Sequence, residues 1–160
     1  MEELSKNKNK PKTIDINKLL KIKKSVTYNS VILHIQASEF VKLDDYDYLI
    51  SQIDDFIGNA KEVNMRRYNK ERFIVYTDLS KTYIKNMDIK FFKQCVPIFQ
   101  DKYPESLEKL ILVNMPVFFK ACFQLVKFLI DKDTRKKIFF EKKNKNKNNL
   151  YTNNLDEIDL

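Results

Sequence analysis

Few residues in this sequence have the types and spacing that enzyme chemistry requires. His34 is the only histidine, and no serine or cysteine stands at a motif spacing that would pair with it as a nucleophile. Cys95 lies close to Pro97, without the glycine-containing loop of a phosphatase or thioredoxin-type site. The single glycine of the chain, Gly58, argues against glycine-rich phosphate loops, which need several glycines for close backbone approach. We therefore expect no catalytic residues and no enzymatic activity.

The remaining polar and sulfur-containing residues do not suggest a metal or redox site. Cysteine and histidine do not cluster at ligand spacings, so we expect neither a metal nor a cofactor. Cys95 and Cys122 fall within apolar helical patterns, which predicts buried, reduced thiols in a cytoplasmic protein. The charged N-terminus lacks an apolar stretch, so no signal peptide is expected. The acidic residues have the pattern of a solvated helix face: Asp44, Asp45, Asp47, Asp54 and Asp55.

The segment after Pro116 carries more apolar surface than a helix in a small domain normally buries. Its polar residues recur at spacings of four, three and four and form one narrow stripe: Lys120, Gln124, Lys127 and Asp131. The apolar residues around this stripe include Val117, Phe118, Phe119, Phe123, Val126 and Phe128. The run is too short to span a bilayer. Either the helix is buried beneath another layer, or its second flank faces a ligand cavity or a membrane; periodicity leaves both explanations open.

Helical and strand patterns alternate along the chain. Branched or apolar runs predict strands at residues 31–36, 73–77, 110–113 and 136–140. Apolar residues at helical spacing predict helices at residues 14–24, from 43 to between 57 and 65, at 89–103 and at 116–130. Pro97 is expected to kink or split the third helix, and Asn86 or Asp88 to cap it. This alternation predicts an α/β sandwich with a mostly parallel or mixed sheet.

The basic charge is concentrated near the N-terminus. The chain has 160 residues and a net charge of +8, of which residues 1–24 contribute +5. We expect these residues to form a basic, largely disordered tail with a short helix at its end. Residues 25–140 then form one domain, followed by a Lys/Asn-rich tail at 141–160. A basic tail weakly favours an anionic membrane surface or nucleic acid, although a solubilising role explains it more simply.

The motifs between Phe73 and Phe140 resemble those of the CRAL-TRIO lipid-binding domain in order and spacing. They are Tyr103-Pro104-Glu105, then Lys109, then Leu112-Val113-Asn114-Met115-Pro116, and finally Thr134 and Lys136-Lys137-Ile138-Phe139. The upstream run is similar to that domain's strand ending in an Asp-Leu-Ser loop: Phe73-Ile74-Val75-Tyr76-Thr77-Asp78-Leu79-Ser80. The resemblance implies a CRAL-TRIO-like α/β/α sandwich with a mostly parallel or mixed sheet of four to five strands.

The resemblance also implies a binding site. In this family the sheet floors a hydrophobic pocket, and the helix after the Asn-x-Pro motif, here at residues 116–130, is a mobile gate. In phosphatidylinositol-binding members a glutamate, a threonine and a lysine contact the headgroup, and the matching residues are Glu105, Thr134 and Lys137. A lysine offers a point charge to a phosphate, while a carboxylate accepts hydrogen bonds from inositol hydroxyls. An ordinary Glu–Lys pair joining two strand ends is the alternative.

This sequence departs from the family pattern at several positions. Ser106 stands where an arginine is common, and apolar Phe73 and Val75 stand where contacts to a choline headgroup lie. Phosphatidylcholine exchange is therefore not expected. The family's N-terminal helical bundle and the Leu-Pro and Gly-Gly segment after the last motif strand have no counterpart, so the domain resembles one trimmed at both ends.

Three functions follow from these patterns. The first is a lipid-binding or lipid-transfer module that takes phosphatidylinositol or another small lipid and transiently contacts anionic membranes in the cytoplasm. The second is a degenerate CRAL-TRIO-like scaffold that binds a protein partner and no ligand. The third is nonspecific nucleic-acid binding by the basic run at residues 132–147, but no interleaved aromatic residues accompany this run, so specific nucleic-acid binding is not expected.

Overall fold

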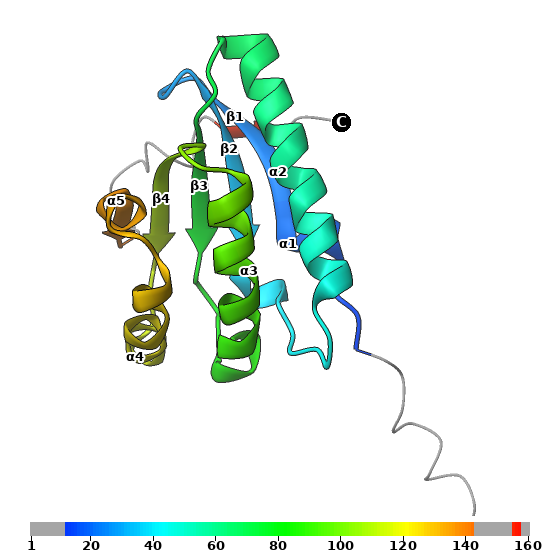
Figure 1. Ribbon diagram of the computed structural model, residues 1–160, viewed down its shortest axis with the longest axis vertical. Helices are drawn as coiled ribbons and strands as arrows, with labels where there is room; N and C mark the ends of the chain where they lie inside the picture. Colours follow the sequence, from blue (N-terminus) through cyan, green and yellow to red (C-terminus); the bar gives the residue numbers. More distant parts are fainter. Residues whose placement is uncertain (1–11, 143–154, 158–160) are drawn as a thin grey trace, which may run out of the picture.

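A six-stranded mixed sheet organises the part of the chain that the computed structural model describes, residues 12–142 and 155–157 (Figure 1). The spatial order of the strands is β5-β4-β3-β2-β1-β6. Their bounds are β1 Leu20–Ser25, β2 Ser30–Gln36, β3 Phe73–Asp78, β4 Leu107–Val113, β5 Ile138–Glu141 and β6 Leu155–Glu157. Strands β2 to β5 pair in parallel, whereas β1 pairs antiparallel with β2 and β6. The predicted α/β fold with a mostly parallel sheet is confirmed.

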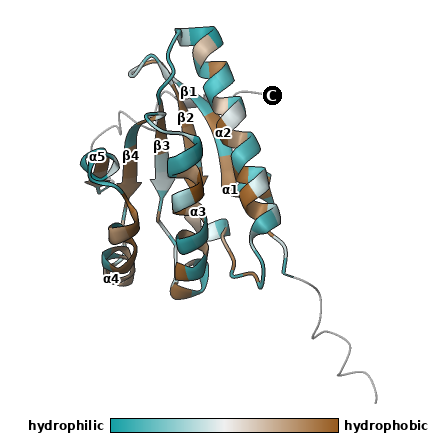
Figure 2. Cartoon of the chain, in the orientation of Figure 1, coloured by the Kyte–Doolittle hydropathy of each residue, from teal (hydrophilic) through white to brown (hydrophobic). Residues whose placement is uncertain are grey.

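Helices and short 3-10 turns connect the strands. They are α1 Ile16–Leu19, η1 Ala37–Glu39, α2 Asp47–Tyr68, η2 Ile84–Asn86, α3 Ile89–Lys102, α4 Val117–Val126, η3 Lys127–Leu129 and α5 Lys132–Lys136. Among the described residues, α2, α3 and α4 pack against the same face of the sheet (Figure 1). In α2 and α3 the apolar side turns toward the strands and the polar side turns outward, whereas α4 is apolar around most of its circumference (Figure 2).

Each strand presents alternate side chains to the two faces of the sheet. The face under the helices carries Leu33 and Val75, which are register partners on β2 and β3. The opposite face carries a second apolar cluster, whose members are each at most 1% exposed: Ile32, Ile74, Tyr76, Ile111 and Val113. Because apolar residues line both faces, the central strands read in sequence as continuous apolar runs.

The N-terminal part of the sheet differs from the sequence-based prediction. A helix was expected at residues 14–24, but α1 ends at Leu19 and residues 20–25 form β1. Buried Leu20 and Ile22 alternate with more exposed Lys21 and Lys23, and this period of two matches a strand paired with β2. Part of the predicted basic tail at residues 1–24 therefore belongs to the sheet, while residues 1–11 lie outside the described part of the chain.

The C-terminal boundaries also differ from the prediction. The last motif strand was expected at residues 136–140, but β5 begins at Ile138 because α5 occupies residues 132–136. Asp131 caps α5 by accepting hydrogen bonds from the backbone N–H groups of Asp133 and Thr134. Within the predicted tail at residues 141–160, Leu155–Glu157 form β6, whereas residues 143–154 and 158–160 lie outside the described part.

Neither Gly58 nor Pro97 divides the helix that contains it. Gly58 lies inside α2, which continues to Tyr68 and ends at Asn69 in the left-handed conformation with φ 52°. Pro97 lies inside α3, and the helix is not split there. Asp88 caps α3 by accepting a hydrogen bond from the backbone N–H of Lys90, as predicted.

Candidate functional site

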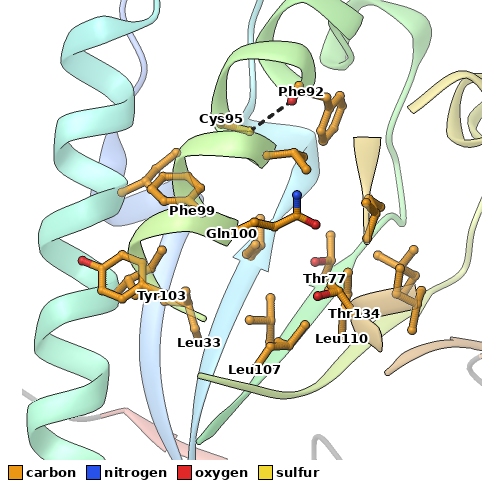
Figure 3. Close-up of a pocket in the computed structure, with 18 of the residues that line it drawn as sticks. Leu33, Thr77, Phe92, Cys95, Phe99, Gln100, Tyr103, Leu107, Leu110 and Thr134 are labelled. Carbon is orange, nitrogen blue, oxygen red and sulfur yellow. Dashed lines mark hydrogen bonds between the residues drawn. The ribbon is translucent and has the colours of Figure 1, made fainter. Parts of the chain in front are cut away.

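A cavity of about 530 Å³ lies between α3 and the helix-covered face of the sheet (Figure 3). Its volume is in the range of small-molecule sites in proteins. The strands supply an apolar floor that includes Leu33, Val75, Leu107, Leu110 and Leu112. Helix α3 supplies a wall that includes Phe92, Cys95, Phe99 and Gln100 (Figure 3). The chain thus builds a mostly apolar pocket on a parallel sheet.

Polar residues gather at one part of this cavity. Glu105, Thr134 and Lys137 all line it, together with Asp131 and Asp133. The Nζ atom of Lys137 lies 3.3 Å from Oε2 of Glu105. The hydroxyl of Thr134 donates a hydrogen bond to Oδ2 of Asp131 at 2.6 Å. The structure therefore brings together the three residues that the family resemblance proposed for a headgroup.

A tight turn after α3 positions Glu105. The backbone N–H of Ser106 donates to the carbonyl oxygen of Tyr103 at 3.3 Å, and Glu105 has a left-handed φ of 61°. The carbonyl oxygen of Ser106 then accepts from the backbone N–H of Phe73 at 3.0 Å. This bond joins the turn to the start of β3 and places Arg72 next to Glu105. The guanidinium Nη2 of Arg72 lies 3.3 Å from Oε2 of Glu105.

Sequence reasoning missed both Arg72 and Asp131 as site residues. Asp131 was placed in the polar stripe of a helix, but it caps α5 instead. Hydrogen bonds from the Thr134 hydroxyl and backbone N–H hold the pKa of the Asp131 carboxyl below its usual range. The capping sequence Asp-x-x-Thr is a local signal for this role.

The predicted gate residues of α4 and η3 divide into three groups. Phe119 alone among them lines the cavity. Phe118 and Phe123 pack against the buried cluster that Phe119 forms with Leu79, Met87 and Leu112, and Val126 is also buried. Val117 and Phe128 face solvent and are 82% and 77% exposed. One flank of the helix therefore packs toward the sheet, and the other is uncovered among the described residues.

Two contacts hold α4 in place. At its start, the side-chain amide of Asn114 donates to the hydroxyl oxygen of Ser80 at 2.7 Å, which links the Asn-x-Pro and Asp-Leu-Ser motifs. Beyond its end, Gln100 of α3 makes two hydrogen bonds. Its Nε2 donates to the carbonyl oxygen of Leu129 at 3.0 Å, and its Oε1 accepts from the backbone N–H of Asp131 at 2.9 Å.

The residues considered for catalysis do not form a site. His34 stacks on Tyr76 with ring centroids 5.2 Å apart, and both belong to the sheet face opposite the cavity. Burial raises the pKa of the Cys95 thiol to about 12, so the thiol is protonated at neutral pH. Within residues 12–142, histidine, cysteine, aspartate and glutamate do not assemble in groups of three that could hold a metal ion. None of the described helices has the length and apolar character needed to cross a membrane.

The chain belongs to the CRAL/TRIO domain family, because the family model matches residues 21–156. The crystal structure of Sfh5 has a similar fold, with a TM-score of 0.56 and 21% sequence identity. The similarity covers 84% of this chain and 50% of the Sfh5 chain, so this chain spans about half the length of that protein. Family membership supports a lipid-binding or lipid-transfer module; members of this family are generally lipid binders and not enzymes.

Proposed function

We propose that this chain binds a phospholipid or another small lipid in the cavity between α3 and the sheet, and presents it or transfers it between membranes. The main support for this proposal is the cavity of about 530 Å³, which has an apolar floor. Three polar residues also line it and are called the polar group below: Glu105, Thr134 and Lys137. Apolar lining favours an acyl chain because its burial removes hydrocarbon surface from water. The polar group gives the headgroup a place at the edge of the same cavity.

Phosphatidylinositol is the ligand that the polar group suits best. The Lys137 ammonium offers a charge to the phosphate, and the Glu105 carboxylate accepts hydrogen bonds from hydroxyls of the ring. The Thr134 hydroxyl now donates to Asp131 and is able to turn toward a phosphate oxygen. The apolar residues Phe73 and Val75 also line the cavity and offer nothing to a choline group.

The uncovered flank of α4 and η3 supports transient membrane contact. Val117, Leu125 and Phe128 are 82%, 61% and 77% exposed. Lys120 and Lys127 lie on the same two elements. Each lysine near an anionic surface contributes about 1 kcal/mol to membrane association. Peripheral attachment at cytoplasmic membranes, with α4 and η3 as the docking element, would place the cavity close to its lipid source.

Lipid loading tests the proposal directly. The purified protein is incubated with phosphatidylcholine vesicles that contain phosphatidylinositol, separated from them and measured by native mass spectrometry. Val75→Trp fills the cavity floor, and Val26→Trp is its control because Val26 is 75% exposed and does not line this cavity. We expect lipid adducts in the wild type and the control but not in Val75→Trp, with circular dichroism confirming that all three fold. Absence of any adduct in the wild type would refute lipid binding.

A ligand-free protein scaffold is the second candidate. The exposed apolar residues of α4 and η3 suit a protein partner as well as a membrane. Charge reversal at the polar group separates the two functions. A protein complex that survives Glu105→Lys and Lys137→Glu, in a chain that loads no lipid, would favour the scaffold.

A further inference from the structure

A second cavity of about 480 Å³ adjoins the first. The two share Pro104, Glu105 and Ser106, so this turn forms a common wall between them. The remaining lining of the second cavity comes from α2 and from the segment that enters β3: Lys61, Glu62, Met65, Glu71 and Arg72. We call the second cavity the polar groove, because five of its eight lining residues, including Glu105, are charged. An apolar compartment and a charged compartment thus meet at the Glu105 carboxylate.

Two cations share one oxygen of Glu105. Arg72 Nη2 and Lys137 Nζ each lie 3.3 Å from Oε2, and they approach from different cavities. The side chains of Arg72 and Glu105 are 53% and 65% exposed, so their ion pair contributes little to stability. A pair of this kind exchanges readily when a better anion arrives. Arg72 is the stronger candidate for such exchange because its planar guanidinium binds a phosphate through two parallel hydrogen bonds.

The charges around the groove restrict the anion that it suits. Together with Lys137, the groove has three basic residues and three acidic ones. A polyphosphate would meet strong repulsion from Glu62, Glu71 and Glu105. A singly charged phosphodiester with several hydroxyl groups fits better, since the carboxylates then accept hydrogen bonds from the hydroxyls. Lys61 lies 5.3 Å from the centre of the Tyr103 ring, which keeps a third cation next to the shared turn.

We propose that Arg72 is a headgroup-binding residue and that the polar groove holds a phosphodiester-linked polyol on the outer side of Glu105. Arg72 and Lys137 bind the phosphate from two sides, while Glu105 turns from ion-pair partner to acceptor of polyol hydroxyls. For a lipid this inference rests on the proposed function, since the acyl chains then occupy the apolar cavity. The same chemistry also recognises a free phosphorylated polyol.

Water-soluble probes test the groove without the lipid cavity. Glycerophosphoinositol, myo-inositol and inorganic phosphate are titrated separately into the full chain by isothermal titration calorimetry. We expect glycerophosphoinositol to bind most tightly and Arg72→Ala to weaken it by about tenfold or more. Arg72→Lys keeps the charge but loses the two-bond geometry, so it should only partly restore binding. Arg67→Ala is the control, because Arg67 is exposed on α2 and lines neither cavity.

Vesicle loading distinguishes a lipid headgroup from a free polyol phosphate. If lipids load and Arg72→Ala lowers the ratio of bound phosphatidylinositol to bound phosphatidylcholine, the groove serves a lipid. If the wild type loads no lipid but binds glycerophosphoinositol through Arg72, the proposed function fails and the groove stands as a site for a soluble ligand. If Arg72→Ala changes neither the lipid ratio nor the affinity for glycerophosphoinositol, the role of Arg72 is refuted, whatever the cavity binds.

Discussion

The thiol of Cys95 lines the apolar cavity, 3.9 Å from the carbonyl oxygen of Phe92 on the previous turn of α3 (Figure 3). Burial raises its pKa from 9.0 to about 12 because the thiolate loses its hydration. Cysteine reacts as the thiolate, so at neutral pH this position has roughly a thousandfold less of the reactive form than an ordinary cysteine. Cys95 is therefore a reporter of cavity access and not a nucleophile.

Labelling rates check this interpretation. In a Cys122→Ser variant, Cys95 should react slowly with a water-soluble maleimide at pH 8, and a bound ligand should slow it further. The sign of the pH dependence follows from the raised pKa: the rate should keep rising above pH 10, whereas the rate of an ordinary thiol with a pKa of 9.0 levels off there. Mass spectrometry measures the rate, with the urea-unfolded variant as control. A plateau near pH 10 in the folded protein would contradict the buried thiol.

Some site residues could be read from sequence because their signals are local. Tyr103-Pro104-Glu105 and the segment 134–139 have the spacing of a known motif, and the structure brings Glu105 and Lys137 into contact. Arg72 had no such signal, since it pairs with Glu105 across 33 positions of the chain. The hydrogen bond from Phe73 to Ser106 and the parallel pairing of β3 with β4 bring the two segments together. Nonlocal backbone contacts of this kind cannot be inferred from spacing.

At the level of elements, one buried amide ties α2 to the sheet. Asn64 is fully buried and lies near the end of α2. Its Oδ1 accepts a hydrogen bond from the backbone N–H of Val31 at 2.7 Å, and its Nδ2 donates to the carbonyl oxygen of Arg72 at 2.6 Å. The amide therefore satisfies backbone groups beside both β2 and β3, which a hydrophobic side chain of similar size is unable to do.

Removing this amide should destabilise the fold. Asn64→Ala leaves buried backbone groups without partners, each costing about 1–3 kcal/mol, so we expect a loss of roughly 2–4 kcal/mol in the free energy of unfolding. Urea denaturation followed by circular dichroism measures it. Asn59→Ala is the matched control on the exposed side of the same helix and should change the free energy little. Equal effects of the two substitutions would contradict the role of Asn64.

Gln100 connects two parts of the cavity lining, α3 and the segment at residues 130–131. Its two hydrogen bonds join α3 to the carbonyl oxygen of Leu129, the last residue of η3, and to the backbone N–H of Asp131. Because a net hydrogen bond contributes about 1 kcal/mol, losing both should favour an open arrangement by roughly 2 kcal/mol. Gln100→Ala should therefore speed lipid exchange with vesicles and increase hydrogen exchange at residues 127–131.

The exposed glutamine of α4 provides the comparison. Gln124 accepts a hydrogen bond from Lys127 and makes no hydrogen bond to α3 among the described residues. Gln124→Ala should leave exchange at residues 127–131 close to the wild-type rate. If Gln100→Ala also leaves that exchange unchanged, Gln100 does not hold the two elements together.

For the whole molecule, the sequence predicted the parallel centre of the sheet better than its antiparallel edge. Branched runs such as Ile74 to Thr77 have no competing helical pattern, so β3 was placed correctly. Residues 14–24 fit in part both the helical period of 3.6 residues and the strand period of two. The structure divides them between α1 and β1. β6 has only three residues and pairs with β1 on the side of the sheet opposite β5. Short edge strands depend on tertiary pairing and leave almost no periodic signal.

The distribution of exposed apolar residues predicts how the molecule meets a membrane. Val117 and Phe128 belong to the α4–η3 surface with Lys120 and Lys127. Tyr83 and Ile84, which are 63% and 67% exposed, lie instead at the start of η2, before α3. If α4 and η3 form the docking element, Val117→Asp with Phe128→Asp should abolish cosedimentation with anionic vesicles. Tyr83→Asp with Ile84→Asp adds the same charge elsewhere and should have a much smaller effect.

Ionic strength separates the two contributions to this docking. Salt at 1 M reduces the screening length to about 3 Å and weakens the attraction of the lysines, but it does not weaken apolar insertion. The wild type should therefore retain part of its vesicle binding in high salt, while the Val117→Asp, Phe128→Asp variant should retain none. Complete loss of wild-type binding in high salt would mean that charge alone holds the protein at the surface. The apolar flank of α4 would then be left for a protein partner, as the scaffold hypothesis requires.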